Sequence, residues 1–241
     1  MNPSPLPEQL KSELDQFQKL GVELASKSRQ LRTEYPQSVG DIRCEVFAQL
    51  FRSLDSYSLA FRFMLTEIFI AKRANFHFPG LMGDPELDEI VVGYERFIQN
   101  GLLYALCQVV ESALRTIFRQ LNPDSHSTGH FQHEIFKPLL KTAEVPEDDP
   151  CAQAIFLLFH MRNCVHNNGY FINPRQSDEI LTYREKSFSF QHGKQPIAGG
   201  RMTLLQITKD VNILFDRLFD LPQVSKIKHI SHIPSVDIEP F

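Results

Sequence analysis

The sequence predicts an all-α protein, a helical bundle with one small β-hairpin or loop insertion before its last helix. Apolar residues recur every three or four positions along most of the chain, which is the period of an amphipathic helix. Asp-Pro pairs at 84–85 and 149–150 each place an N-cap side chain before a proline at the first helical position. The alternation typical of a strand is confined to residues 186–190.

Composition agrees with a single large globular core. Of the 241 residues, 42% are hydrophobic and 22% are charged. A net charge of −4 disfavours a broad nucleic-acid-binding surface but leaves room for a local basic site. The cysteines have no C-x-x-C spacing and the N-terminal residues show no targeting signal, so we expect reduced thiols and a cytoplasmic location. The most apolar stretch, residues 57–70, contains Arg62 and Glu67, which favours a core helix over a membrane span.

The first part of the chain, residues 1–80, is expected to form a pair of helices that packs on the rest. From residue 7 to about 32 one apolar stripe recurs at helical intervals, made of Leu10, Leu14, Phe17, Leu24 and Leu31. Tyr35-Pro36 ends the stripe, and Asp41 is expected to cap a second helix that runs to about residue 74. Pro79-Gly80 then stops this helix.

Residues 81–222 are expected to form the main helical bundle, and residues 223–241 an extended C-terminal tail. Gly169 is placed to end the helix that Asp149-Pro150 starts. Thr203 and Gln206 fit a capping box at the start of the last helix, in which two side chains satisfy free backbone N–H groups. The expected helices cover residues 85–121, 131–141, 150–168 and 203–221, and residues 170–202 hold the hairpin or loop.

The helix expected at 150–168 has no polar face along residues 155–159, IFLLF. A helix that is apolar all round belongs at the centre of a bundle or in an oligomer interface. Its end is different, because Arg162 and His166 lie four residues apart and therefore on one face, and Asn163 and Asn167 form a second such pair. Exposed carbonyls in the last turn favour a cation, and an imidazole exchanges protons near neutral pH. Clustered carboxylates that would bind a metal are missing from this motif, so we expect chemistry without metal or cofactor.

The segment MRNCVHNNG, which follows the apolar helix, resembles the Arg-Asn…His signature of HEPN domains. The resemblance covers roughly residues 85–221, and Glu111 on the preceding long helix is similar to the glutamate that often faces the signature in this family. Members are all-α bundles found in toxin, phage-defence and RNA-processing systems. The resemblance therefore implies a HEPN-like bundle at residues 81–222.

The resemblance also implies an activity. Active HEPN proteins are metal-independent endoribonucleases that work as dimers, with the motif helices of two subunits facing each other. Carried over by position, Arg162 binds the scissile phosphate, His166 moves the proton of the ribose 2′-hydroxyl, and Asn163 orients one of them, with Glu111 and Asn167 in support. The implied partners are RNA, a second copy of the chain, and an antitoxin-like or nucleotidyltransferase protein.

Other interpretations stay open beside the ribonuclease. Only three residues separate Arg162 from His166, whereas the family usually has a longer gap, and non-catalytic members act as RNA-binding or protein-interaction modules. A helical regulatory protein is a third class, but the sequence contains no recognisable DNA-reading helix. The motif side chains could also pair with Glu111 or Glu95 as a purely structural cluster.

Two more groups of residues are candidates for binding. Arg184, Lys186 and Lys194 stand among the aromatic residues Tyr183, Phe188 and Phe190, a pattern that fits RNA binding or, slightly better, a hairpin packed on the bundle. His126, His130, His133 and Glu134 suggest a metal site only weakly, and histidines of a surface loop are the favoured interpretation. His160 is expected to be a hydrogen-bonded core residue, and Cys164 inert packing rather than a nucleophile.

Overall fold

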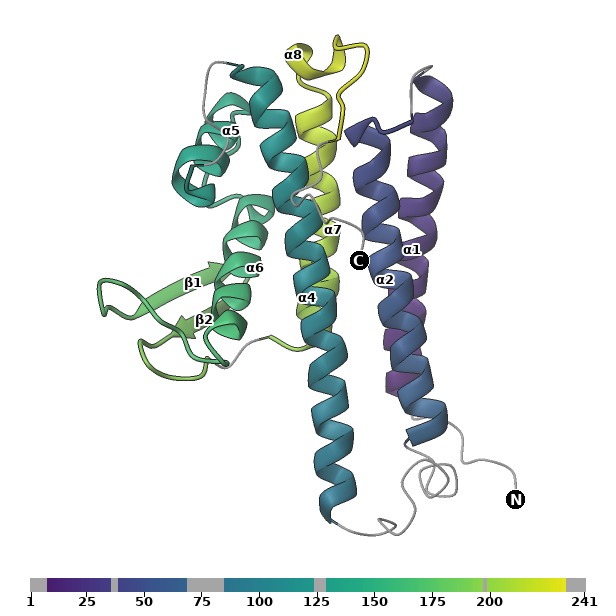
Figure 1. Cartoon of the computed structure of the whole chain (residues 1–241), viewed down its shortest axis with the longest axis vertical. Coiled ribbons are helices and arrows are strands. Elements are labelled where there is room, and N and C mark those ends of the chain that lie inside the picture. Colours follow the sequence, from purple (N-terminus) through teal and green to yellow (C-terminus); the bar gives the residue numbers. More distant parts are fainter. Residues whose placement is uncertain (1–7, 36–38, 69–84, 124–128, 197–198, 233–241) are drawn as a thin grey trace, which may run out of the picture.

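The protein is mostly helical, and one two-stranded sheet lies beside the bundle (Figure 1). The computed structural model describes residues 8–35, 39–68, 85–123, 129–196 and 199–232. Its elements are α1 Glu8–Glu34, α2 Ile42–Phe63, the π-helix η1 Met64–Ile68, α4 Pro85–Leu121, the π-helix η2 Phe131–Phe136, α5 Lys137–Thr142, α6 Pro150–His166, β1 Glu179–Tyr183, β2 Lys186–Phe190, α7 Arg201–Phe219 and α8 Pro222–Ser225. The predicted helical bundle with a hairpin before its last long helix is confirmed at this level.

In the N-terminal pair, α1 packs on α2, and α2 packs along α4 (Figure 1). Asp41 caps α2 as predicted, because its side chain accepts a hydrogen bond of 2.9 Å from the backbone N–H of Arg43. The α-helix ends at Phe63 and continues as the π-helix η1 to Ile68, and the predicted end of this helix, at about residue 74, lies outside the described residues. Pro79-Gly80 and Asp84 lie outside the described residues.

Helix α6 runs through the centre of the main bundle. Its apolar run is buried within the single chain, with Leu157 and Leu158 fully covered. The same apolar core includes residues of α1, α2, α4, α6 and α7. A central position in the bundle therefore accounts for a helix without a polar face, and no partner is needed to cover it.

Helix α4 contains a segment, Glu89–Leu121, that is long and apolar enough to cross a membrane by those two measures. Two thirds of its most apolar window, 67%, is buried inside the protein. The core helix of a bundle has the same properties, so this segment gives only weak support for a membrane span.

The two ends of α6 follow the predicted signals. Asp149 accepts a hydrogen bond of 2.8 Å from the N–H of Cys151 and so caps the first turn. At the other end, Gly169 has φ +89°, and its N–H donates 2.8 Å to the carbonyl of Cys164. This left-handed residue reverses the chain and satisfies a terminal carbonyl, a role for which glycine is favoured.

Two details of the C-terminal part correct the sequence prediction. The Thr203–Gln206 capping box is wrong, because α7 already begins at Arg201 and the N–H of Thr203 bonds the carbonyl of Gly200 at 2.9 Å. The extended tail is wrong for residues 223–225, which belong to a short helix, whereas residues 226–232 contain no helix. Residues 222–225 form α8, and the buried Ile230 then binds beside Asp41, with its N–H 3.1 Å from the carboxylate. Burial of apolar side chains explains why this segment stays on the bundle.

The hairpin is antiparallel, with Tyr183 opposite Lys186 and Leu181 opposite Phe188. Its two-residue turn is Arg184-Glu185, and Arg184 takes the left-handed conformation, φ +54°, that tight hairpin turns need. Tyr183, Phe188 and Phe190 are all buried. The hairpin therefore attaches to α6 by its aromatic side chains.

Candidate functional site

The predicted motif residues meet side chains of α4 at the C-terminal end of α6. Arg162 donates 3.0 Å from Nη1 to Oε2 of Glu111, and 3.2 Å from Nε to Nε2 of His166. Glu111 also binds Arg115, whose Nε and Nη2 lie 3.0 Å and 2.7 Å from Oε1. We call Glu111, Arg115, Arg162 and His166 the arginine–histidine cluster.

The charges of this cluster do not cancel. Two guanidinium groups share one carboxylate, so two positive charges and one negative leave +1 while the imidazole is neutral. The side chain of Arg162 keeps 31% of its surface exposed, and His166 is exposed as well. An anion can therefore approach a fixed cation that lies beside a proton-accepting nitrogen.

The neighbours of His166 fix its position. The ring edge meets Tyr104 of α4, with the ring centroids 5.1 Å apart and the planes at 72°. Nε2 accepts the hydrogen bond from Arg162, so this nitrogen carries no proton in the arrangement seen. The imidazole is therefore held in a form that can act as a base.

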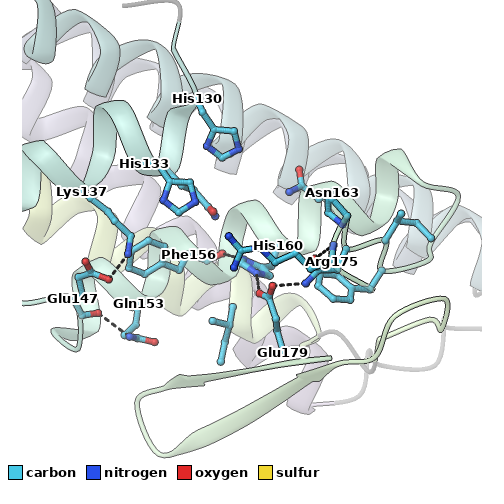
Figure 2. Close-up of a pocket in the computed structure, with 16 residues that line it drawn as sticks. His130, His133, Lys137, Glu147, Gln153, Phe156, His160, Asn163, Arg175 and Glu179 are labelled. Atoms are coloured by element: carbon cyan, nitrogen blue, oxygen red, sulfur yellow. Dashed lines mark hydrogen bonds and ion pairs between the residues drawn. The ribbon is translucent and has the colours of Figure 1, made fainter. Parts of the chain in front are cut away.

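The two asparagines of the motif lie apart from the cluster. Asn167 donates 2.9 Å from its side chain to the carbonyl of Asn163 and so satisfies the backbone of its own helix end. Asn163 is exposed and lines a separate hollow (Figure 2). The structure thus brings Arg162, His166 and Glu111 together and leaves Asn163 and Asn167 on the neighbouring stripe of α6.

The alternative partner Glu95 is engaged elsewhere. Arg201, at the start of α7, binds both Glu95 and Glu13 and lies over the ring of Phe61. This contact joins α1, α4 and α7. Glu111 is therefore the glutamate that faces the motif.

The hairpin residues predicted to bind RNA have other contacts. Arg184 forms two hydrogen bonds to Asp210, at 2.6 Å and 3.0 Å, and these bonds raise the pKa of Arg184 above its usual value. The hydroxyl of Tyr183 donates to the same carboxylate at 2.5 Å. Base stacking on the three hairpin aromatics is blocked by their burial, so packing on the bundle is the better explanation of this pattern. Lys186 and Lys194 are exposed.

The remaining candidate residues are the other histidines and Cys164. His160 is a hydrogen-bonded residue as predicted, with Nδ1 2.9 Å from the carbonyl of Phe156 and Nε2 2.7 Å from Glu179. Among the described residues no group of three or more His, Cys, Asp and Glu side chains could hold a metal ion, and His126 lies outside them. Burial raises the pKa of Cys164 to about 11, so its thiol stays protonated and is a poor nucleophile.

Sequence reasoning missed one member of the cluster, Arg115, and one neighbour of it, Tyr104, although each had a signal. Arg115 lies four residues after Glu111, the spacing of an ion pair along a helix. Tyr104 precedes Glu111 by seven residues, which places both on one face of α4.

No protein-family model, curated protein or solved structure matches this chain significantly. The resemblance to HEPN domains therefore rests on the motif residues alone.

Proposed function

We propose that the protein is a metal-independent endoribonuclease of HEPN type, with the arginine–histidine cluster as its active site. The observation that carries the proposal is the contact between Arg162 and His166 on an exposed helix end, with the guanidinium anchored by Glu111. Cleavage of RNA by its own 2′-hydroxyl needs a base near neutral pH and a fixed cation for the developing phosphate charge. The cluster provides both groups.

In the proposed reaction, the 2′-hydroxyl gives its proton to Nε2 of His166 as the 2′-oxygen attacks the adjacent phosphorus. The bond from phosphorus to the 5′-oxygen breaks, that oxygen takes a proton from a water molecule, and a 2′,3′-cyclic phosphate remains. The hydroxide left from this water takes the proton from Nε2 of His166, which restores the neutral imidazole. Arg162 neutralises charge on the phosphate oxygens. For this to occur, the substrate hydroxyl takes the place of Arg162 Nε at His166, while Nη1 stays bound to Glu111.

We also propose a homodimer, in which the exposed ends of two α6 helices face each other and share the RNA. The exposed side chains Asn163, His166 and Asn167 would line the shared cleft. Light scattering at micromolar concentration should give twice the chain mass of 27.8 kDa. A strictly monomeric protein would contradict the shared cleft. An antitoxin-like or nucleotidyltransferase partner belongs to this proposal and is tested by co-purification with the neighbouring gene products.

The decisive experiment is cleavage of labelled RNA by the full chain in excess EDTA. Wild type should cleave, and His166→Ala and Arg162→Ala should each lower the rate by about 100-fold or more, as for loss of a general base or of a charge-stabilising group. Arg29→Ala is the matched control, because it removes the same charge from an exposed position of α1. Folded wild type that cleaves no RNA, or His166→Ala that cleaves at the wild-type rate, would refute the ribonuclease.

A second candidate is a non-catalytic RNA-binding module at the same surface. The observation in its favour is that Nε2 of His166 already accepts a hydrogen bond from Arg162, although the reaction needs this nitrogen to accept the 2′-hydroxyl proton. This candidate predicts RNA binding without cleavage, weakened by Arg162→Ala and unchanged by Arg29→Ala in an electrophoretic shift assay.

A further inference from the structure

The hollow that Asn163 lines has a volume of about 530 Å³ and lies beside the arginine–histidine cluster. It is an open hollow bordered by η2, α6 and the chain that leads into β1 (Figure 2). We call it the histidine hollow, because His130 and His133 stand at one side of it and His160 forms part of its wall. Asn163 of α6 and Arg175 also line it (Figure 2).

Short covalent and packing links join this hollow to the cluster. Arg115 of the cluster donates 3.1 Å to the carbonyl of Gly129, the residue before His130. The next residue, Phe131, stacks on Phe159 of α6, with ring centroids 4.3 Å apart. On the other side, Asn163 directly follows Arg162 in α6. An RNA bound at Arg162 is therefore close to the edge of the hollow, which begins at the next residue of α6, Asn163.

The two carboxylates that line the hollow both have hydrogen-bond partners. Glu179 is bound by His160 at 2.7 Å and by the amide of Asn173 at 2.6 Å. Glu147 is paired with Lys137 at 2.8 Å. Arg175, by contrast, is exposed and has no carboxylate partner among the described residues. The hollow thus offers an anionic ligand one cation that has no carboxylate partner among the described residues, together with several hydrogen-bond donors.

The loop that carries Arg175 is held in place before any ligand arrives. Asn173 is only 7% exposed, and its side chain accepts from the N–H of Arg175 at 2.8 Å and donates to Ser177 at 3.1 Å. Its own N–H bonds Nδ1 of His192 at 3.1 Å. Such an arrangement lowers the ordering cost of binding, because the backbone of the loop is already fixed.

The walls also offer flat and apolar surfaces for a ring. The exposed rings of His130 and His133 lie 5.1 Å apart at a tilt of 32°, and the half-buried Leu181 lines the hollow with them. Phe156 and Phe171 also line it but are buried, so they form the packed wall behind this surface and not a face for stacking. Aromatic walls with a few hydrogen-bonding groups and a nearby cation are what a nucleobase and its phosphate require. The size of the hollow is that of small-molecule sites in general.

We propose that the histidine hollow binds one nucleotide, with the base between the histidine rings and the apolar wall and the phosphate at Arg175. Where the ligand is RNA, this nucleotide neighbours the one whose phosphate binds Arg162, a statement that rests on the proposed function. The binding of a free mononucleotide does not depend on cleavage. The two claims can therefore be tested separately.

The test is calorimetric titration of the full chain with each 5′-mononucleotide, the matching nucleoside and inorganic phosphate. We expect a mononucleotide to bind, and both removal of its phosphate and Arg175→Ala to weaken binding at least tenfold. His133→Ala, another exposed position, should also weaken it. The matched control is Arg96→Ala, which removes the same charge from an exposed residue of a different hollow and should leave the affinity unchanged.

Three results would overturn the proposal. The first is that no mononucleotide binds at millimolar concentration. The second is that Arg96→Ala and Arg175→Ala lose affinity equally, and the third is that inorganic phosphate binds as tightly as the nucleotide. The variant Arg162→Ala separates the two claims, because it should abolish RNA cleavage and keep mononucleotide binding. Mononucleotide binding that needs Arg175, in a protein that cleaves no RNA, supports the hollow and refutes the ribonuclease.

Discussion

Replacement of Asp41 by alanine should be among the most damaging single changes in the protein. The carboxylate is fully buried and accepts from the N–H of Arg43 at 2.9 Å, from the Arg43 side chain at 2.9 Å and 2.7 Å, and from the N–H of Ile230 at 3.1 Å. Loss of an N-cap costs about 1 kcal/mol. A buried guanidinium left without its partner costs about 3–5 kcal/mol. The two costs overlap because one carboxylate serves both, so we expect Asp41→Ala to lower the free energy of unfolding by about 4 kcal/mol.

Urea unfolding followed by circular dichroism measures this change. The control is the double variant Asp41→Ala/Arg43→Met, which removes the buried charge as well and should recover part of the loss. A loss below about 1 kcal/mol in the single variant, or a double variant no more stable than the single one, would refute the reasoning.

The same carboxylate gives stability a defined dependence on pH. Burial acts to raise the pKa of Asp41, but hydrogen bonds from Arg43 and Ile230 outweigh it and hold the pKa below its usual value. A lowered pKa contributes stability that is complete above the unfolded pKa of about 3.9 and is lost as pH falls through the folded pKa. The unfolding free energy of Asp41→Ala should therefore fall less steeply below about pH 4 than that of wild type.

Two further predictions concern the thiols and the cluster. The four cysteines are buried, and burial raises the pKa of Cys164 to about 11, so Ellman's reagent at pH 8 should react with the native protein far more slowly than with the urea-unfolded chain. Rapid labelling of native Cys164 would show that this helix end opens. Glu111→Gln should raise the cluster charge from +1 to +2 and tighten RNA binding in a shift assay, at a cost of about 1 kcal/mol of stability for a half-exposed ion pair. Unchanged RNA binding would mean that RNA does not contact the cluster.

Elements with strong local signals could be predicted from the sequence. The helix at 150–168 was expected from the cap Asp149, its apolar run and Gly169, and all three act within a few residues of the chain. The π-helices at 64–68 and 131–136 could not be predicted, because such turns respond to packing against other elements. The start of the last helix was misplaced at Thr203, because Gly200 serves as N-cap without a side chain to signal it.

In the candidate site too, contacts set by helical spacing could be predicted from the sequence, whereas contacts set by packing between elements could not. Helical spacing alone placed Arg162 and His166 on one face, and the structure brings them into contact. The choice of Glu111 over Glu95 depends on which part of α4 meets α6, and local sequence does not contain that information. The place of Arg175 at the histidine hollow depends on Asn173 and on contacts with the chain after β2, which local sequence does not contain.

The central claim is that His166 accepts the 2′-hydroxyl proton of RNA at a cation held by Glu111. The most direct test uses an RNA cleaved by wild type in EDTA and the same strand with a single 2′-deoxy nucleotide at the cleavage site. The account predicts that wild type leaves a 2′,3′-cyclic phosphate end on the product and does not cleave at the 2′-deoxy position. His166→Ala should cleave neither RNA. Cleavage at the 2′-deoxy position, or a product without the cyclic phosphate, would contradict it.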